Sequence, residues 1–155
     1  MFLLIQGQLY AHCQVPCGIY NDALRIAQIQ EDFKTIEKAM EQINQLSNST
    51  NVQDLNQYIR WVNTKEDHAS RIQETVSDYF LLQRIKAKTI KEDKAYNSYV
   101  EQTTILHQLM VRAMKCKQTV NQNNVKNGLE LLDRFVNKYF DDHGRKHIKE
   151  ITGSH

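Results

Sequence analysis

The stretch IAQIQEDFKTIEKAMEQI, residues 26–43, decides the fold of this chain. Its larger apolar residues recur in alternating steps of three and four, at positions 26, 29, 33, 36, 40 and 43. This period places them on one face of an amphipathic helix and leaves the charged residues on the other face. Such a stripe must be buried against other elements, so the stretch predicts a helix that packs in a bundle.

Three further apolar stripes follow, separated by polar stretches at 47–51, 86–93 and 121–124. Asp54 or a neighbour can cap the second helix. The stripes contain Leu55, Ile59, Val62, Ala69, Ile72, Val76 and Tyr79; then Tyr96, Val100, Thr103, Leu106, Met110, Ala113 and Val120; then Val125, Leu129, Leu132, Val136 and Tyr139. Short connections between long helices predict an all-α fold, an up-down-up-down antiparallel four-helix bundle over residues 21–143. Gly144 is expected to stop the last helix and residues 144–155 to form a C-terminal tail.

The composition agrees with one globular helical domain. The chain has 155 residues, of which 41% are hydrophobic and 25% charged, with only one proline and five glycines to interrupt helices. Its 20 basic and 18 acidic residues are interleaved and give a net charge of +2. The sequence therefore lacks the concentrated basic stripe that binding of nucleic acid needs, and we expect no nucleic-acid partner. The longest apolar run, residues 1–5, is too short to span a membrane.

The segment before the bundle, His12-Cys13-Gln14-Val15-Pro16-Cys17-Gly18-Ile19-Tyr20, has a different chemistry. Two of the three cysteines, a histidine, the only proline and a glycine fall within seven positions. One interpretation is a small disulfide-closed loop in an exported protein. The other is a metal site, because two thiols beside an imidazole are ligands suited to zinc, copper or nickel. The spacing alone leaves both interpretations open.

The residues that precede this segment favour the metal site. The stretch MFLLIQGQLYA, residues 1–11, begins apolar and ends in a small residue, as a signal peptidase requires. It lacks a basic start and its apolar core is short, so we expect it to be a propeptide or the end of a longer signal that a maturation protease removes. Export or a periplasmic location follows if it is a signal, and a cytoplasmic location otherwise. Cleavage after Ala11 would make His12 the N-terminus.

A free amine at His12 would change the metal chemistry of the segment. The amine and the Cys13 peptide nitrogen close a five-membered chelate ring, within which a metal can displace the amide proton. The thiolates of Cys13 and Cys17 complete a planar set of two nitrogens and two sulfurs, which nickel(II) favours. The His12 imidazole can reach an axial position. Pro16 and Gly18 provide the turn that returns Cys17 to the metal.

The pattern His-Cys-x-x-Pro-Cys-Gly-x-Tyr at residues 12–20 resembles the metal hook of the nickel superoxide dismutases. Other segments resemble the same family: Arg60-Trp61 with Lys65-Glu66, Ser77-Asp78-Tyr79-Phe80 and Leu106-His107-Gln108-Leu109. The resemblance therefore covers nearly the whole chain after residue 11. It implies a homohexamer, one nickel ion per subunit and superoxide as the substrate. Gln14 departs from the family, whose members often have an acidic residue there.

The resemblance also implies roles for single residues. His12 would give its amine and imidazole, Cys13 its backbone nitrogen and thiolate, and Cys17 its thiolate. The metal would alternate between nickel(II) and nickel(III), converting superoxide to oxygen and hydrogen peroxide. Tyr20 would stand at the mouth of the site and hydrogen-bond the substrate or an ordered water.

The partner of the His12 imidazole is less well defined by the sequence. Glu66 lies on the second apolar stripe, where a carboxylate must be paired, either with that imidazole or in a salt bridge. His68 is a further candidate partner, or simply a surface histidine. Cys116 lies on a core stripe and is expected to be a buried, inert thiol.

Two expectations concern the protein as a whole. Aromatic residues are crowded on two helices, which favours an oligomer interface; they are Trp61, Tyr79, Phe80, Phe135, Tyr139 and Phe140. The hypothesis that competes with an enzyme is a non-catalytic exported helical bundle, with a Cys13–Cys17 disulfide, that acts as a binding module.

Overall fold

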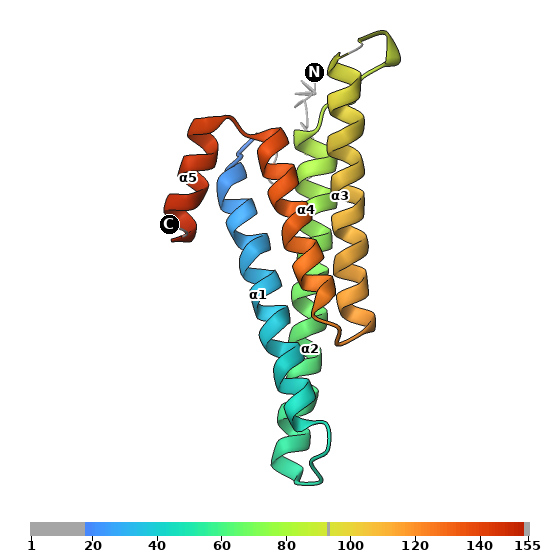
Figure 1. The fold of residues 1–155 in the computed structure, drawn as a ribbon, viewed down its shortest axis with the longest axis vertical. Helices are drawn as coiled ribbons and strands as arrows, with labels where there is room; N and C mark the ends of the chain where they lie inside the picture. Colours follow the sequence, from blue (N-terminus) through green and yellow to red (C-terminus); the bar gives the residue numbers. More distant parts are fainter. Residues whose placement is uncertain (1–17, 93, 154–155) are drawn as a thin grey trace, which may run out of the picture.

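A computed structural model describes residues 18–92 and 94–153 (Figure 1). Their elements, in order, are α1 (Asp22–Leu46), α2 (Val52–Glu74), the π-helix η1 (Thr75–Arg84), the 3₁₀ turn η2 (Ile90–Glu92), α3 (Lys94–Gln118), α4 (Asn123–Tyr139) and α5 (Asp142–Thr152). The described residues form no strand. Helices α1 to α4 pack side by side in alternating directions, which confirms the all-α bundle.

The first helix forms where the sequence predicts it. Asn21 caps α1, its side-chain oxygen accepting the Leu24 N–H at 3.0 Å. All six residues of the predicted stripe are buried: Ile26, Ile29, Phe33, Ile36, Met40 and Ile43. They face α2 and α4, with which α1 packs. Gly128 of α4 permits the close approach of that helix, because a Cβ there would lie 2.4 Å from Cζ of Phe33.

The second helix begins as expected and then changes its geometry. Asn51 caps α2, accepting the N–H groups of Gln53 (2.8 Å) and Asp54 (3.3 Å). From Thr75 the helix continues as η1, with a wider turn that ends where the Ile85 N–H donates to the Phe80 carbonyl at 2.8 Å. A π-helix is rare and often marks a functional site. The apolar periodicity alone predicted an ordinary α-helix here.

Aromatic side chains fill the end of the bundle at which α1 begins. Their rings form a continuous series of contacts, with centroids 4.9–5.9 Å apart: Tyr20–Tyr79, Tyr79–Phe80, Phe80–Phe135, Phe80–Tyr139, Phe135–Tyr139 and Tyr139–Phe140. The chain's own core therefore accounts for most of the crowded aromatic residues. The crowding no longer favours an oligomer interface, and the hexamer stays a prediction.

The C-terminal part differs from the sequence expectation. The fourth helix ends at Tyr139, and Asp141 caps a fifth helix by accepting the Gly144 N–H at 2.8 Å. Gly144 thus lies in the first turn of α5 instead of stopping the preceding helix. The glycine that ends a helix here is Gly153, with φ +64°. Ile148 of α5 is buried and the helix packs against α1, so most of the expected tail is ordered.

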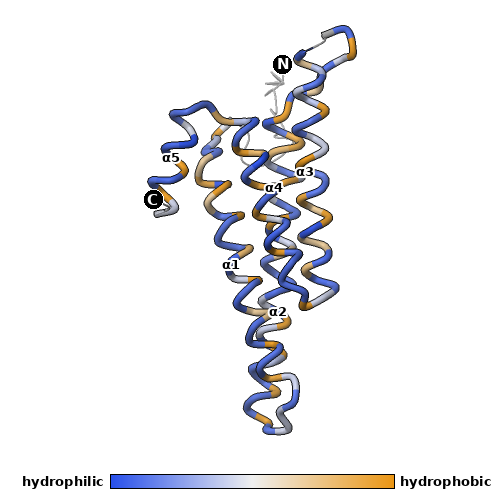
Figure 2. The backbone as a smooth tube through the Cα atoms, in the orientation of Figure 1, coloured by the Kyte–Doolittle hydropathy of each residue, from blue (hydrophilic) through white to orange (hydrophobic). Residues whose placement is uncertain are grey.

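The opposite end of the bundle is formed by α1 and α2 alone. These helices continue past the ends of α3 and α4 (Figure 1), and we call their connection and the first turns of α2, residues 44–60, the distal hairpin. Val52, Leu55 and Ile59 are 82%, 45% and 59% exposed there. Leu55 and Ile59 were expected in the core, but of the described helices only α1 runs alongside this part of α2. Figure 2 shows apolar and polar positions interspersed along this hairpin.

None of the helices among the described residues combines the length and the apolar character needed to cross a membrane.

Candidate metal centre

Most of the predicted ligand segment lies outside the described residues. This applies to His12, Cys13, Pro16 and Cys17, whose roles stay predictions. The structure begins to describe the chain at Gly18, whose φ of +80° is a left-handed conformation that glycine adopts most readily. The backbone at this position therefore turns, as the sequence predicts. This turn lies at the end of the bundle at which α1 begins.

Tyr20 is held against η1 at the start of the described chain. Its ring meets the Tyr79 ring edge-on, with centroids 5.8 Å apart, and the Arg84 guanidinium lies 4.4 Å from its centroid. A cation over an aromatic face is attracted by the ring, so both contacts fix the ring's orientation. The side chain stays 38% exposed. No hydrogen-bond partner for its hydroxyl is found among the described residues.

Asp22, two residues further along, is the centre of a polar cluster. Its Oδ1 accepts hydrogen bonds from the Tyr79 hydroxyl (2.6 Å) and Arg84 Nε (2.8 Å). Its Oδ2 accepts hydrogen bonds from the Tyr139 hydroxyl (2.7 Å) and Arg84 Nη2 (2.7 Å). We call these four residues the Asp22 cluster. A two-pronged Arg–carboxylate pair is strong and directional, so the cluster joins α1, η1 and α4 at one point.

The cluster changes the acidity of its members. Burial alone would raise the pKa of Asp22, but the hydrogen bonds from Arg84, Tyr79 and Tyr139 outweigh it and lower that pKa below its usual value. Burial and the bond to the carboxylate raise the pKa of Tyr139 to about 12 and that of Tyr79 further. At neutral pH the Asp22 carboxylate is therefore ionised, and both phenols stay protonated and donate hydrogen bonds to it.

A second guanidinium lies near the cluster without a carboxylate partner. Arg25 lies 5.3 Å from the centroid of the Tyr79 ring, and its Nη1 donates to the neutral Gln28 side chain at 2.8 Å. Within the described ranges no ion pair involves Arg25, whereas Arg84 is neutralised by Asp22. Among the residues that the structure describes, Arg25 therefore places a positive charge beside Tyr79 that no carboxylate neutralises.

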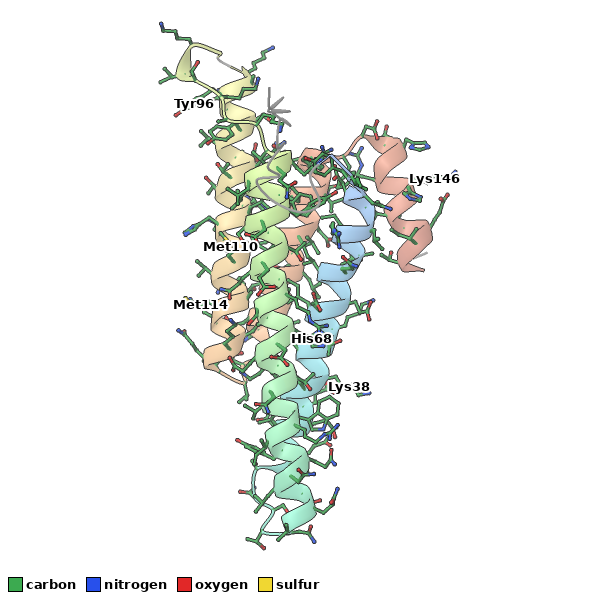
Figure 3. All side chains as sticks on the ribbon, turned by 180° about the vertical axis from the view of Figure 1, so that it is seen from behind. Lys38, His68, Tyr96, Met110, Met114 and Lys146 are labelled. Atoms are coloured by element: carbon green, nitrogen blue, oxygen red, sulfur yellow. The ribbon has the colours of Figure 1, made fainter. Side chains whose placement is uncertain are left out.

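The two candidate partners of His12 have partners of their own. Glu66 accepts a bond from the buried Lys65 at 2.7 Å, which is the salt bridge given above as the alternative. Lys65 also donates to the Cys116 carbonyl at 2.9 Å, near the far end of α3. His68 lies in the middle part of α2 (Figure 3), and its Nδ1 is 2.6 Å from Asp32 Oδ1 of α1. Contact of either with His12 stays a prediction.

The third cysteine is structural. Cys116 is completely buried, and burial raises the pKa of its thiol to about 11, which keeps it protonated. This confirms the burial expected for Cys116 from its place on a core stripe. Across residues 18–92 and 94–153 no three His, Cys, Asp or Glu side chains come together to hold a metal.

The fold and the N-terminal segment together define an all-helical bundle whose distinctive chemistry lies ahead of its first helix. Residues 8–143 match the family model described as nickel-containing superoxide dismutase, a match that spans both the hook and the bundle. The chain belongs to this family and is a nickel-dependent superoxide dismutase, an oxidoreductase. No match was found among curated proteins or among solved structures.

Asp22, Arg84 and Tyr139 did not emerge as site residues from the sequence. Tyr139 fitted a core stripe, and Asp22 could be taken for an ordinary acidic residue in a first helical turn. Their convergence depends on the π-helical turn and on the docking of α4. The position of Asp22 close behind the hook was the one available signal.

Proposed function

We propose that the mature enzyme begins at His12 and holds one nickel ion per subunit through that residue, Cys13 and Cys17. The observation that supports this is the family match, because it covers the hook as well as the bundle. Bound nickel would supply one-electron redox chemistry by alternating between the nickel(II) and nickel(III) states.

The residues present fit this ion. Two thiolates are soft donors that stabilise a higher oxidation state, and an amine, an amide nitrogen and an imidazole complete the set. His12 would provide the amine and imidazole, and Cys13 its backbone nitrogen with its thiolate. The left-handed turn at Gly18 agrees with a loop that folds back before α1 begins, and Pro16 would restrict the same turn.

Tyr20 would donate a hydrogen bond to superoxide or to an ordered water at the mouth of the site. The Asp22 cluster explains why this phenol is suited to the role. Tyr79 and Tyr139 already donate their protons to Asp22, so neither is available to a ligand. Tyr20 has its ring fixed by Arg84 and Tyr79 but no such acceptor among the described residues.

Arg25 would raise the local concentration of the anionic substrate. Its charge is not paired with a carboxylate in the described structure, and it lies 5.3 Å from the centroid of the Tyr79 ring, which in turn contacts the Tyr20 ring. An uncompensated cation within a Debye length, about 8 Å at physiological ionic strength, attracts an anion over that range.

The remaining parts of the proposal concern processing and assembly. A maturation protease would remove residues 1–11, and the mature chains would assemble as a homohexamer. The enzyme would act in the periplasm or outside the cell if residues 1–11 end a signal peptide, and in the cytoplasm otherwise. Glu66 and His68 remain candidates for orienting the His12 imidazole.

Removal of one thiol tests the proposal. The chain starting at His12 should bind nickel and accelerate superoxide decay, whereas Cys17→Ser should lose both properties. Cys116→Ala is the matched control, since it removes the buried thiol and should leave metal content and activity unchanged. Full activity of the Cys17→Ser protein would refute the assignment of Cys17.

A further inference from the structure

The Asp22 cluster lies where the hook enters the bundle, and it is more than a helix cap needs. Asn21 already caps α1 through the Leu24 N–H. An acidic residue in a first turn is normally stabilised by the helix dipole while it stays in water. The Asp22 side chain is instead only 14% exposed and binds groups from η1 and α4.

The π-helix makes this convergence possible. Tyr79 and Arg84 are five residues apart, which in an α-helix would leave them about 140° apart around the axis. The hydrogen bonds of a π-helix join residues i and i+5, so here both side chains fall on the same face. Both reach Oδ1 of Asp22. The unusual helix therefore serves a contact with the first turn after the hook.

The same two side chains hold Tyr20. The Arg84 guanidinium donates to Asp22 through Nε and Nη2, and its Cζ lies over the Tyr20 ring, 4.4 Å from the centroid. The Tyr79 hydroxyl binds Asp22 while its ring meets Tyr20 edge-on. Asp22 therefore acts on Tyr20 through both of its neighbours without touching it in the described contacts.

We propose that Asp22 is a positioning residue for the metal site: its carboxylate fixes Arg84 and Tyr79, which hold Tyr20 and the exit of the hook in place. The inference rests on the proposed function only in placing Tyr20 at the mouth of that site. Without the carboxylate, the guanidinium loses its fixed orientation and the Tyr20 ring loses its support. The hook would then leave the bundle from a less defined point.

The first test needs no metal. In the nickel-free chain starting at His12, the NMR signals of the Tyr20 ring protons can be assigned by comparison with the Tyr20→Phe spectrum. The neighbouring Tyr79 ring should displace their chemical shifts from the values of an unstructured tyrosine. Asp22→Asn should move them toward unstructured values while the helical circular dichroism is retained. Asp67→Asn, the same change at an exposed carboxylate of α2, should leave them unmoved. Unchanged Tyr20 shifts in a folded Asp22→Asn protein would overturn the inference.

A second variant guards against loss of folding. Arg84→Lys keeps the positive charge but loses the planar fork, so it should release Tyr20 in the same way. If the Tyr20 shifts survive this substitution as well, the inference is wrong.

Nickel binding provides the second measurement. Asp22→Asn should weaken nickel affinity about tenfold, a typical cost of removing an outer support of a metal site, and alter the thiolate-to-nickel absorption bands. Wild-type affinity and bands in a variant with released Tyr20 would show that the cluster does not act on the hook. Failure of the wild-type chain itself to bind nickel would instead refute the proposed function, while the NMR result would still decide what Asp22 does to Tyr20.

Discussion

The two ends of this bundle are built in opposite ways. At the end that carries the hook, α1, η1 and α4 converge on the Asp22 carboxylate above a series of packed aromatic rings. At the distal hairpin two helices continue alone, and apolar residues such as Ile59 are more than half exposed. Nearly the same apolar periodicity runs through both ends. What differs is how many elements reach each end, so tertiary arrangement determines which apolar positions become core.

The difference also separates rigid and tolerant parts of the molecule. A metal site needs ligands and substrate-facing groups held by packed, hydrogen-bonded neighbours. The hook end supplies those neighbours, whereas the distal hairpin has few buried side chains to lose. Substitutions should therefore have large effects near Tyr20 and small effects near the connection of α1 and α2.

The largest effect on stability is expected from Phe80→Ala. Phe80 is completely buried and touches the rings of Tyr79, Phe135 and Tyr139. Its truncation leaves a cavity in the centre of the hook end and should lower the free energy of unfolding by about 3–5 kcal/mol. Urea unfolding of the metal-free chain measures this. A loss below about 1 kcal/mol would mean that the aromatic series is not a packed core.

Tyr139→Phe should have the next largest effect, because it removes one hydrogen bond to a charged carboxylate. We expect a loss of about 1.5–3 kcal/mol at neutral pH, again by urea unfolding. The matched control is Tyr96→Phe in the first turn of α3, where the partly buried tyrosine has no carboxylate partner among the described residues; it should cost almost nothing.

Comparison of the wild-type protein with Tyr139→Phe should also reveal a pH dependence of stability. The pKa of Tyr139 is raised in the folded state to about 12 from 10.0, so its contribution is complete below pH 10 and is lost as the pH rises through about 12. Wild-type stability should therefore fall over this range more steeply than that of Tyr139→Phe. Parallel curves for the two proteins would contradict the hydrogen bond to Asp22.

Arg25→Gln should affect catalysis more than folding. Loss of the uncompensated charge beside Tyr79 should lower kcat/KM for superoxide about three- to tenfold at low ionic strength, and added salt should narrow the difference. Stopped-flow decay of superoxide measures both. Arg60→Gln on the distal hairpin is the control; an equal, equally salt-sensitive loss there would assign the effect to overall charge.

The smallest effect is expected from Ile59→Ser. Its side chain is already largely in water, so the free energy of unfolding of the isolated chain should change by less than about 0.5 kcal/mol. The substitution can be compared directly with Phe80→Ala, since both remove apolar atoms from one continuous helical segment. A loss of several kcal/mol would show that the distal hairpin is covered in solution.

The sequence predicted the bundle well because local periodicity carries that information. The stripe on α1 is buried at every predicted position, and α2 is capped by Asn51, three residues before the expected Asp54. Helix lengths relative to one another were not predictable in this way, so the exposure of Leu55 and Ile59 was missed. Asp141 is a good N-cap residue and so a signal for α5, but Gly144 in the first turn of that helix favours a stop when the sequence is read alone.

The candidate site also has a part that the sequence predicts and a part that it does not. The hook residues could be singled out because their chemistry is concentrated in nine consecutive positions. The Asp22 cluster draws on positions 22, 79, 84 and 139, and it depends on a π-helix that apolar spacing does not reveal. Residues that support a site from distant parts of the chain require the tertiary structure to be recognised.

The metal centre built on the His12 amine can be tested by the rate of superoxide decay with two nickel-loaded chains. One chain begins at His12 and the other at Ala11, so they differ by a single residue that moves the free amine away from the histidine. The His12 chain should remove superoxide much faster than free nickel salt, and the Ala11 chain should not exceed the salt. Equal rates for the two chains would contradict a metal centre built on the amine of His12.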